Sequence, residues 1–230
     1  MDLSKLKLKI MPGAPSYCDT YISEHNESFQ LWCETWKNFY KEIGQEDSFN
    51  KNTFYRCSFV TTLFYEESAI ALILGSDFNL NYKACSNHSY LNFYDDQFLD
   101  EMIKRKNYHI TSLESFTVSE EFQYEKTGIP LAYIIGMLAS KYSETLSNNG
   151  TMISVRSDIQ IFEKFAKQCG YERIISNYKS GNLTLDNIFI TNGSLDIPKD
   201  GLLNLINKVW DQRQDFNKEI VTKSITKKVA

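Results

Sequence analysis

The stretch Leu113–Leu131, LESFTVSEEFQYEKTGIPL, decides which fold the sequence favours. Its first residues are rich in β-branched and aromatic types and continue an apolar run, so we predict a strand over residues 108–118. A polar loop follows. After Gly128, an apolar helix begins at Pro130 and ends near residue 146. Proline suits the first helical position because its missing N–H is not needed there.

Helix and strand patterns continue on both sides of this stretch. Three- and four-residue spacing of apolar residues predicts helices, and runs of β-branched and aromatic residues predict strands. The expected helices cover residues 23–43, 97–104 (capped by Asp95 or Asp96), 158–168 (capped by Asp158) and 198–216. The expected strands cover residues 54–65, 68–75, 151–156, 171–178 and 183–190. Because strands and helices alternate from residue 108 to 178, we expect parallel pairing within the mixed central sheet of an α/β (α+β) fold.

The length fits one domain with short ends. The chain has 230 residues, of which 42% are hydrophobic, and this is enough to bury a sizeable core. We expect residues 23–216 to form that domain. Residues 1–22 are expected to be irregular because two prolines and a glycine interrupt them. Residues 217–230 are expected to form a frayed basic tail.

Charge and composition argue against several classes of function. Asp and Glu number 29 against 25 Lys and Arg, and the net charge of -4 does not attract nucleic acid. Only the lysines of the tail favour such a partner. No segment approaches the roughly 20 apolar residues of a membrane span, so we expect a soluble protein of the cytoplasm. The cysteines and histidines lack the spacing of metal ligands, and we expect no metal site.

The start of the helix at Pro130 is a candidate anion site. A helix N-terminus presents unsatisfied N–H groups and a positive dipole end, and Gly128 lets a phosphate approach the backbone closely. The same residues also fit an ordinary turn, and from these residues alone both interpretations stay open.

Two pairs of motifs resemble the GNAT acyltransferase superfamily, over roughly residues 54–178. LESFTVSEEF and EKTGIPL resemble the family's fourth strand and the R/Q-x-x-G-x-G/A loop that opens the next helix. Glu125 stands in place of the Arg or Gln, and Pro130 in place of the second Gly or Ala. At the right distance, VRSD (155–158) and FAKQCGY (165–171) resemble the fifth strand and the F-Y-E-K-x-G-F ending. The chain is also similar in outline to N-acyl amino acid synthases and acyl-homoserine-lactone synthases, which share this core and about this length.

The resemblance implies a GNAT-like fold in which the fourth and fifth strands splay apart. It also implies an N-acyltransferase that moves an acyl group from a thioester to a small-molecule or peptide amine. The co-substrate would be acetyl-CoA or another acyl-CoA, with its pyrophosphate on the amides of Lys126, Thr127, Gly128 and Ile129. Because Pro130 removes an amide there and an acidic side chain precedes it, an acyl carrier protein is the alternative donor.

Glu114 is the catalytic residue that the resemblance implies. An amine must lose a proton as it attacks the thioester carbonyl, and several family members carry a catalytic glutamate at this place in the strand. Apolar neighbours such as Phe116 would raise the pKa of this carboxyl by desolvation. The alternative is an ordinary strand residue, salt-bridged or open to water. A main-chain amide at Phe116 or Val118 would stabilise the oxyanion.

The family's general acid, a tyrosine, falls on Ala166 in this register. Tyr171, Tyr133 and Tyr124 are candidates to replace it, and a thiolate also leaves without being protonated. The missing tyrosine also fits the alternative, a catalytically inactive GNAT-fold module that binds a thioester, a nucleotide or a protein partner.

Two aromatic segments leave alternatives open. The helix over residues 23–43 carries Trp32 and Trp36, which fit either a core face against the sheet or the wall of an acyl or acceptor pocket. The region of His88 and residues 90–96 fits either an acceptor-binding loop or a solvated surface loop.

Overall fold

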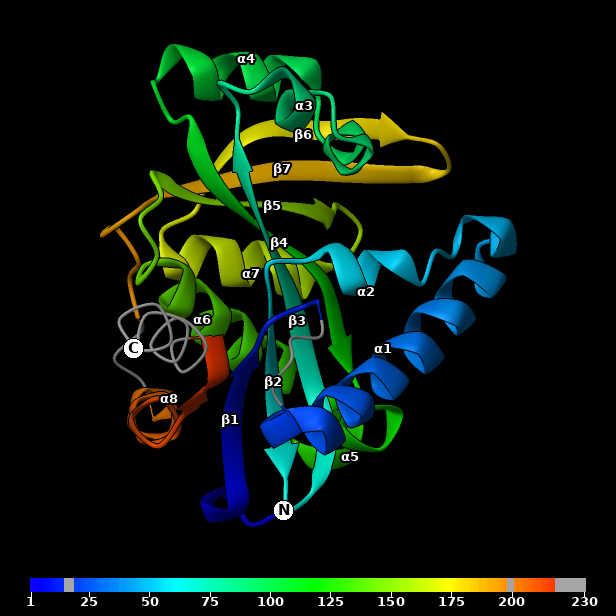
Figure 1. The fold of residues 1–230 in the computed structure, drawn as a ribbon, viewed down its shortest axis with the longest axis vertical. Helices are drawn as coiled ribbons and strands as arrows, with labels where there is room; N and C mark the ends of the chain where they lie inside the picture. Colours follow the sequence, from blue (N-terminus) through cyan, green and yellow to red (C-terminus); the bar gives the residue numbers. More distant parts are fainter. Residues whose placement is uncertain (15–18, 198–200, 218–230) are drawn as a thin grey trace, which may run out of the picture. The chain divides into compact units, whose positions relative to one another are not determined.

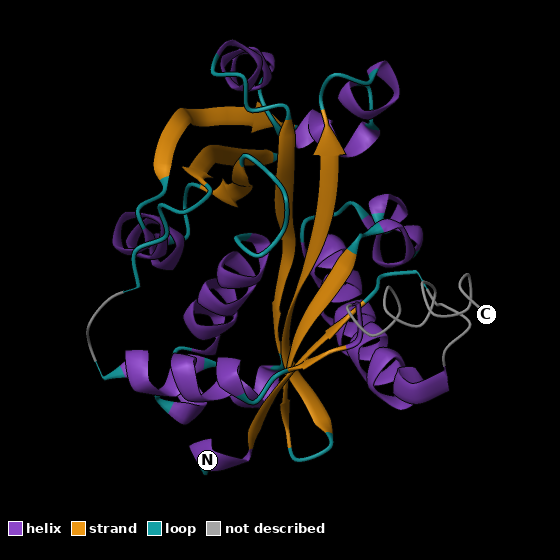
Figure 2. Cartoon of the chain, turned by 60° about the vertical axis from the view of Figure 1, so that its left-hand side comes forward, coloured by secondary structure: helices purple, strands orange, loops and turns teal. Residues whose placement is uncertain are grey.

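The computed structural model describes residues 1–14, 19–197 and 201–217 (Figure 1). The described strands form one eight-stranded sheet in the order β6-β7-β5-β4-β3-β2-β1-β8. The strands are β1 (Leu6–Met11), β2 (Phe59–Tyr65), β3 (Ser68–Asn79), β4 (His109–Val118), β5 (Gly150–Arg156), β6 (Glu172–Ser180), β7 (Leu183–Thr191) and β8 (Gln214–Asp215). The helices are α1 (Ile22–Glu42), α2 (Asn52–Arg56), α3 (Lys83–Ser86), α4 (Asp96–Lys104), α5 (Tyr124–Thr127), α6 (Leu131–Ser143), α7 (Gln160–Cys169) and α8 (Leu202–Asp211). The predicted α/β fold with a mixed sheet flanked by helices is confirmed (Figure 2).

The chain divides into two compact units, and β3 and β4 each contribute residues to both. Unit 1 comprises residues 1–74, 115–138 and 204–230, and unit 2 comprises residues 75–114 and 139–203. Each unit has apolar clusters of its own.

The first strand of unit 1 lies where irregular structure was expected. Leu6–Met11 form β1, which pairs antiparallel with β2 and parallel with β8, so the expectation of an irregular segment is wrong for these residues. Leu8 and Ile10 alternate along this strand and are fully buried. The prolines and the glycine follow the strand and do not interrupt it.

The main apolar cluster of unit 1 joins the aromatic helix α1 to α2, β2 and β3. Its members are Trp32, Phe54, Cys57, Val60, Leu72 and Leu74. The strand predicted over residues 54–65 therefore begins later, because residues 52–56 form α2 and Phe54 enters the cluster from that helix. The prediction that α1 supplies a core face is confirmed for Trp32, which is 2% exposed.

The apolar cluster of unit 2 gathers residues from the segment before α4, from α4 itself and from four strands. Its members are Phe78, Leu80, Leu91, Tyr94, Phe98, Met102, Ile110, Met152 and Phe189. The predicted cap of α4 is confirmed, since Oδ1 of Asp95 accepts a hydrogen bond from the N–H of Gln97 at 2.8 Å. This cap fixes the start of the helix that buries Phe98 and Met102.

Three strands of unit 2 pair antiparallel, with β7 between β5 and β6. Gly150 begins β5 where a side chain does not fit, because a Cβ there would lie 2.2 Å from the carbonyl oxygen of Ile190. The parallel pairing predicted between residues 108 and 178 is found between β4 and β5.

Two predicted helix ends differ from the structure. Asp158 does not cap α7, because its Oδ2 pairs with Nη2 of Arg156 at 2.6 Å and the N-cap residue is Ile159. The helix predicted over 198–216 is the shorter α8, followed by the short strand β8. Residues 198–200 and the expected tail from residue 218 onward lie outside the described residues.

Candidate active site

The parallel strands β4 and β5 pair over a short distance only. Their register runs through three pairs, Ile110–Gly150, Thr111–Thr151 and Ser112–Met152. Both strands continue beyond these pairs, β4 to Val118 and β5 to Arg156. Within the described residues, the main-chain groups that follow Ser112 on β4 and Met152 on β5 are therefore not paired with each other. The predicted splay of the fourth and fifth strands requires that their pairing stops in this way.

Ser115 interrupts the regular course of β4 three residues after the last of these pairs. Its φ of 59° lies in the left-handed region, which non-glycine residues seldom adopt. Oγ1 of Thr117 donates to the carbonyl oxygen of Ser115 at 2.8 Å and stabilises this conformation. Because a left-handed residue breaks the two-residue alternation of a strand, period two does not place Phe116 and Val118 on the face of Glu114.

Glu114 is buried, with 5% of its surface exposed. Oγ of Ser76, on the neighbouring strand β3, donates a hydrogen bond to Oε1 of Glu114 at 2.6 Å. The alternative in which this carboxylate is open to water is wrong. A buried carboxylate that keeps a hydrogen bond is a group suited to accept a proton from a substrate.

Two tyrosines reach the same face of β4 from the segment before α4. Ser112, which lies two residues before Glu114, contacts the hydroxyls of Tyr90 at 3.1 Å and of Tyr94 at 2.9 Å. Burial raises the pKa of both hydroxyls well above the usual value, and the charge of Glu114 raises them further. Both tyrosines therefore remain neutral hydrogen-bonding groups at physiological pH.

The segment that carries these tyrosines is anchored to the sheet of unit 2. Tyr90 belongs to a 3-10 helix over Ser89–Phe93. The amide of Asn187 on β7 donates to the carbonyl oxygen of Phe93 at 3.2 Å, and its Oδ1 accepts from the N–H of Asp95 at 2.9 Å. Oγ of Ser154 donates to the same carbonyl at 2.9 Å. The alternative of a solvated surface loop therefore does not describe this segment.

The four amides expected to hold a pyrophosphate already donate hydrogen bonds within the chain. The N–H groups of Lys126 and Thr127 donate to the carbonyl of Gln123, that of Gly128 to Tyr124, and that of Ile129 to Oγ1 of Thr127. Gly128, with a φ of 69°, ends the short helix α5. The chain here forms a helix end followed by a turn, and a phosphate would have to replace these bonds.

The charges around these amides do not favour an anion. The connection between β4 and α6 carries Glu120, Glu121 and Glu125 against one basic residue, Lys126. Nζ of Lys126 lies 3.0 Å from Oε1 of Glu120. Three carboxylates and a single paired lysine repel a pyrophosphate at close range.

The predicted site residues fall in both units. Glu114, the predicted catalytic residue, belongs to unit 2. Its neighbours in the same unit were not predicted as individual site residues, and they are Ser76, Tyr90, Tyr94 and Ser112. The region 90–96 was expected to be either an acceptor-binding loop or a solvated surface loop. Ser76 carries no sequence signal, because its partner lies 38 residues away. The other predicted site residues, Phe116, Val118, Lys126, Thr127, Gly128 and Ile129, belong to unit 1.

The candidates for the general acid lie in different surroundings. Tyr171 is buried and its hydroxyl lies 2.8 Å from Oγ of Ser140, and burial raises its pKa. Tyr133 is also buried, whereas Tyr124 is 57% exposed. Ala166 is buried in α7 and supplies no proton.

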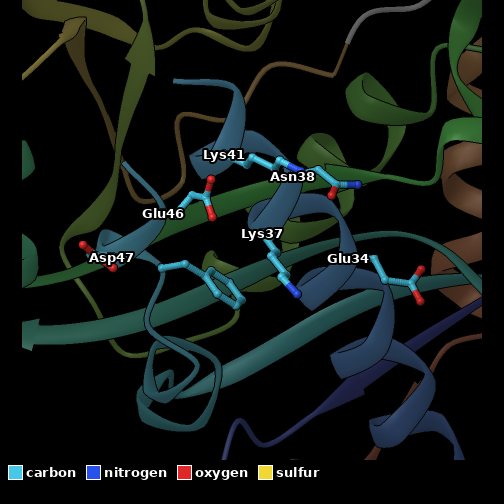
Figure 3. Close-up of a pocket in the computed structure, with 7 residues that line it drawn as sticks. Glu34, Lys37, Asn38, Lys41, Glu46 and Asp47 are labelled. Carbon is cyan, nitrogen blue, oxygen red and sulfur yellow. The ribbon is translucent and has the colours of Figure 1, made fainter. Parts of the chain in front are cut away.

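A surface pocket of about 560 Å³ lies in unit 1 along α1 (Figure 3). The residues that line it are Glu34, Lys37, Asn38, Lys41, Glu46, Asp47 and Phe49. Lysine and carboxylate side chains both line this pocket, so its charge selects no single class of ligand.

No group of His, Cys, Asp and Glu residues that could hold a metal ion occurs among the described residues. In the same part of the chain, no helix is long and apolar enough to cross a membrane.

Comparison with known proteins gives a likeness in structure only. No family model and no curated protein matches the chain. The acyl-homoserine lactone synthase BjaI, described with SAM and isopentyl-CoA, superposes with a TM-score of 0.55 at 7% identity and covers 91% of this chain and 93% of its own. The N-acyl amino acid synthase FeeM, from uncultured soil microbes, has a TM-score of 0.51 at 12% identity and covers 80% and 89%. An acyl-CoA N-acyltransferase from Pseudomonas aeruginosa has a TM-score of 0.51 at 10% identity and covers 80% and 98%. The chain has a GNAT-like fold.

Proposed function

We propose that the protein is an N-acyltransferase that moves an acyl group from a thioester to an amine. The observation that carries this proposal is the pairing of β4 and β5, which stops at Ser112 and Met152 just before the buried Glu114. Main-chain N–H and C=O groups of β4 and β5 that do not pair with each other can bind the amides of a pantetheine arm. Glu114, the proposed base, lies at this end of the pairing. The GNAT-like fold shared with several acyltransferases also supports the proposal.

In the proposed reaction, the nitrogen of the amine attacks the thioester carbonyl and Glu114 takes a proton from that nitrogen. The carbonyl oxygen becomes an oxyanion, and a main-chain amide at Phe116 or Val118 stabilises it. When the intermediate collapses, the carbon–sulfur bond breaks and the thiolate leaves with the electron pair. Because a thiolate is a good leaving group, the reaction does not need the tyrosine that Ala166 replaces.

The donor is a thioester of coenzyme A or of an acyl carrier protein, and both carry the pantetheine arm. The engaged amides of Lys126–Ile129 and the neighbouring carboxylates favour a donor whose binding depends little on a pyrophosphate. The acceptor is a small-molecule or peptide amine, and the segment with Tyr90 and Tyr94 is the acceptor side of the site.

The test is an assay of thiol release with acyl-CoA and acyl-carrier thioesters against a panel of amines. Glu114→Gln keeps the size of the side chain and removes the base, so turnover should fall at least tenfold while the donor still binds. Glu172→Gln, which changes an exposed carboxylate of the same unit, is the matched control and should retain full turnover. An unchanged rate in Glu114→Gln would remove this residue from the mechanism.

A catalytically inactive binding module is the second candidate, and the buried Ala166 favours it. Such a module would bind a pantetheine thioester in calorimetry, but no thiol would be released when amines are added. Thiol release that requires Glu114 would exclude this candidate.

A further inference from the structure

A short hydrogen bond from Ser76 on the neighbouring strand holds the carboxylate of Glu114. Ser76 is 4% exposed and Glu114 is 5% exposed, so little water reaches either group. The 2.6 Å separation of Oγ and Oε1 is typical of a hydroxyl that donates to a charged carboxylate. Away from water, this bond favours the charged form of Glu114, whereas burial alone favours the protonated form.

Three hydroxyls, those of Ser112, Tyr90 and Tyr94, also lie on this face of β4. Ser112 donates its single hydroxyl proton to the oxygen of Tyr90, so the bond between Ser112 and Tyr94 must use the proton of Tyr94. The hydroxyls of Tyr94, Ser112 and Tyr90 thus form one connected network, in which the two tyrosine hydroxyls also hydrogen-bond to each other.

The charged neighbours of this cluster can be separated from it. Asp77 follows Ser76 on β3 and lies on the opposite face, where its Oδ1 accepts from Oγ1 of Thr111 at 2.7 Å. His88 precedes the tyrosines, and its Nδ1 accepts from the N–H of Tyr90 at 3.1 Å. A pH titration of the site must therefore distinguish Glu114 from Asp77, His88 and the two tyrosines.

We propose that Ser76 is the positioning residue of Glu114, which holds the orientation of the carboxylate that takes the proton from the amine. This inference rests on the proposed function. Ser76 does not touch the substrate. It acts by keeping the carboxylate in one orientation and in its charged form. The loss of its hydroxyl should therefore release the carboxylate from this orientation and favour its protonated form.

The test follows the Glu114 carboxyl by ¹³C NMR, with its signal assigned by its absence in Glu114→Gln. In Ser76→Ala the midpoint of this titration should rise by about one pH unit, as expected when one charge-assisted hydrogen bond is lost. In Ser76→Thr, which keeps a hydroxyl, the midpoint should stay near that of the unmodified protein. Ser143→Ala removes another fully buried serine hydroxyl of unit 2 and should not move the midpoint.

Activity supplies the second readout. In a plot of turnover against pH, the acid limb should shift to higher pH in Ser76→Ala, in parallel with the NMR midpoint. In Ser76→Thr it should stay near that of the unmodified protein. If Ser76→Ala does not fold, Ser76→Cys keeps the shape with a weaker donor and should show a smaller rise. An NMR midpoint that stays in place or falls would overturn the role of Ser76. A raised midpoint in a protein that releases no thiol from any thioester would keep that role and contradict the proposed function.

Discussion

The indole Nε1 of Trp36 donates a hydrogen bond to Oγ1 of Thr117 at 3.0 Å and ties α1 to β4 within unit 1. The hydroxyl of Thr117 in turn donates a hydrogen bond to the carbonyl oxygen of Ser115, the residue of the strand with a left-handed φ. The half-buried Trp36 thus does more than cover a core face, because it holds the strand two residues beyond the irregular position.

We expect Trp36 and Thr117 to be energetically coupled. Trp36→Phe and Thr117→Val each remove one partner of the bond, and each should lower the free energy of unfolding by about 1 kcal/mol. In a double-mutant cycle measured by urea unfolding, the coupling energy should be about 0.5 kcal/mol or more. Gln30→Ala, at an exposed position of α1, is the control. If the effects of the two single substitutions on the free energy of unfolding simply add up in the double variant, the coupling is contradicted.

Backbone strain at Ser115 predicts an unusual order of stabilities. Ser115→Gly relieves a left-handed φ and should change the free energy of unfolding by no more than about 0.5 kcal/mol, because the more flexible unfolded chain offsets the relief. Ser115→Val places a β-branched residue at this φ and should cost more than about 1.5 kcal/mol. Chemical denaturation gives both values. A valine variant as stable as the glycine variant would exclude the strained conformation.

The Lys9–Glu24 pair predicts a pH-dependent contribution to stability. Nζ of Lys9 lies 2.7 Å from Oε1 of Glu24, and Lys9 is buried. Burial raises the pKa of the Glu24 carboxyl, but the hydrogen bond and charge of Lys9 lower it more, so the net pKa is below the usual value. The contribution of the pair is therefore present above the unfolded pKa of Glu24 and is lost as the pH falls through the folded pKa.

Glu24→Gln should accordingly cost about 2 kcal/mol of unfolding free energy at pH 7, because it leaves the buried Lys9 charge without its carboxylate. The cost should shrink when unfolding is measured near pH 3. Glu120→Gln breaks an exposed pair and should change stability little at either pH. An equal cost of Glu24→Gln at both pH values would contradict the assignment.

The connection between β4 and α6 predicts which donors are used. Its amides are engaged and its carboxylates outnumber its lysine, so the nucleotide of coenzyme A should add little to binding. An acyl-pantetheine and the matching acyl-CoA should therefore differ in kcat/KM by less than about tenfold, or 1.4 kcal/mol. Competition between the two donors measures this ratio. A preference of a thousandfold or more for the coenzyme A thioester would show that a phosphate site forms there on binding.

Local patterns in the sequence predict much of the fold. The strand over residues 108–118 and the Asp95 cap of α4 follow from composition and spacing and are confirmed. The first strand was not predicted, and residues 6–11 were wrongly expected to be irregular although Leu6, Leu8 and Ile10 alternate. The prolines and the glycine that follow it were given more weight than this alternation. The burial of Lys9 in the strand also depends on Glu24, which lies 15 residues away in the sequence.

The candidate site is less accessible to sequence reasoning. The place of Glu114 follows from the resemblance of its motif to a known family, and its burial from the apolar strand around it. The left-handed Ser115 has no signal, since serine rarely adopts that φ. The hydrogen bonds of the amides 126–129 depend on a helix of four residues that is too short to show periodicity. Ser76, Tyr90 and Tyr94 join the site through contacts that only the folded chain creates.

The most direct test of the proposed function is a crystal structure with a non-hydrolysable acyl-pantetheine thioether. We predict that the amides of its arm bind main-chain groups of Leu113–Glu114 on β4 or of Ile153–Arg156 on β5. The acyl carbonyl should lie within reach of an amine that contacts Glu114. An analogue bound elsewhere, or β4 and β5 paired continuously past Ser112 and Met152, would contradict the proposal.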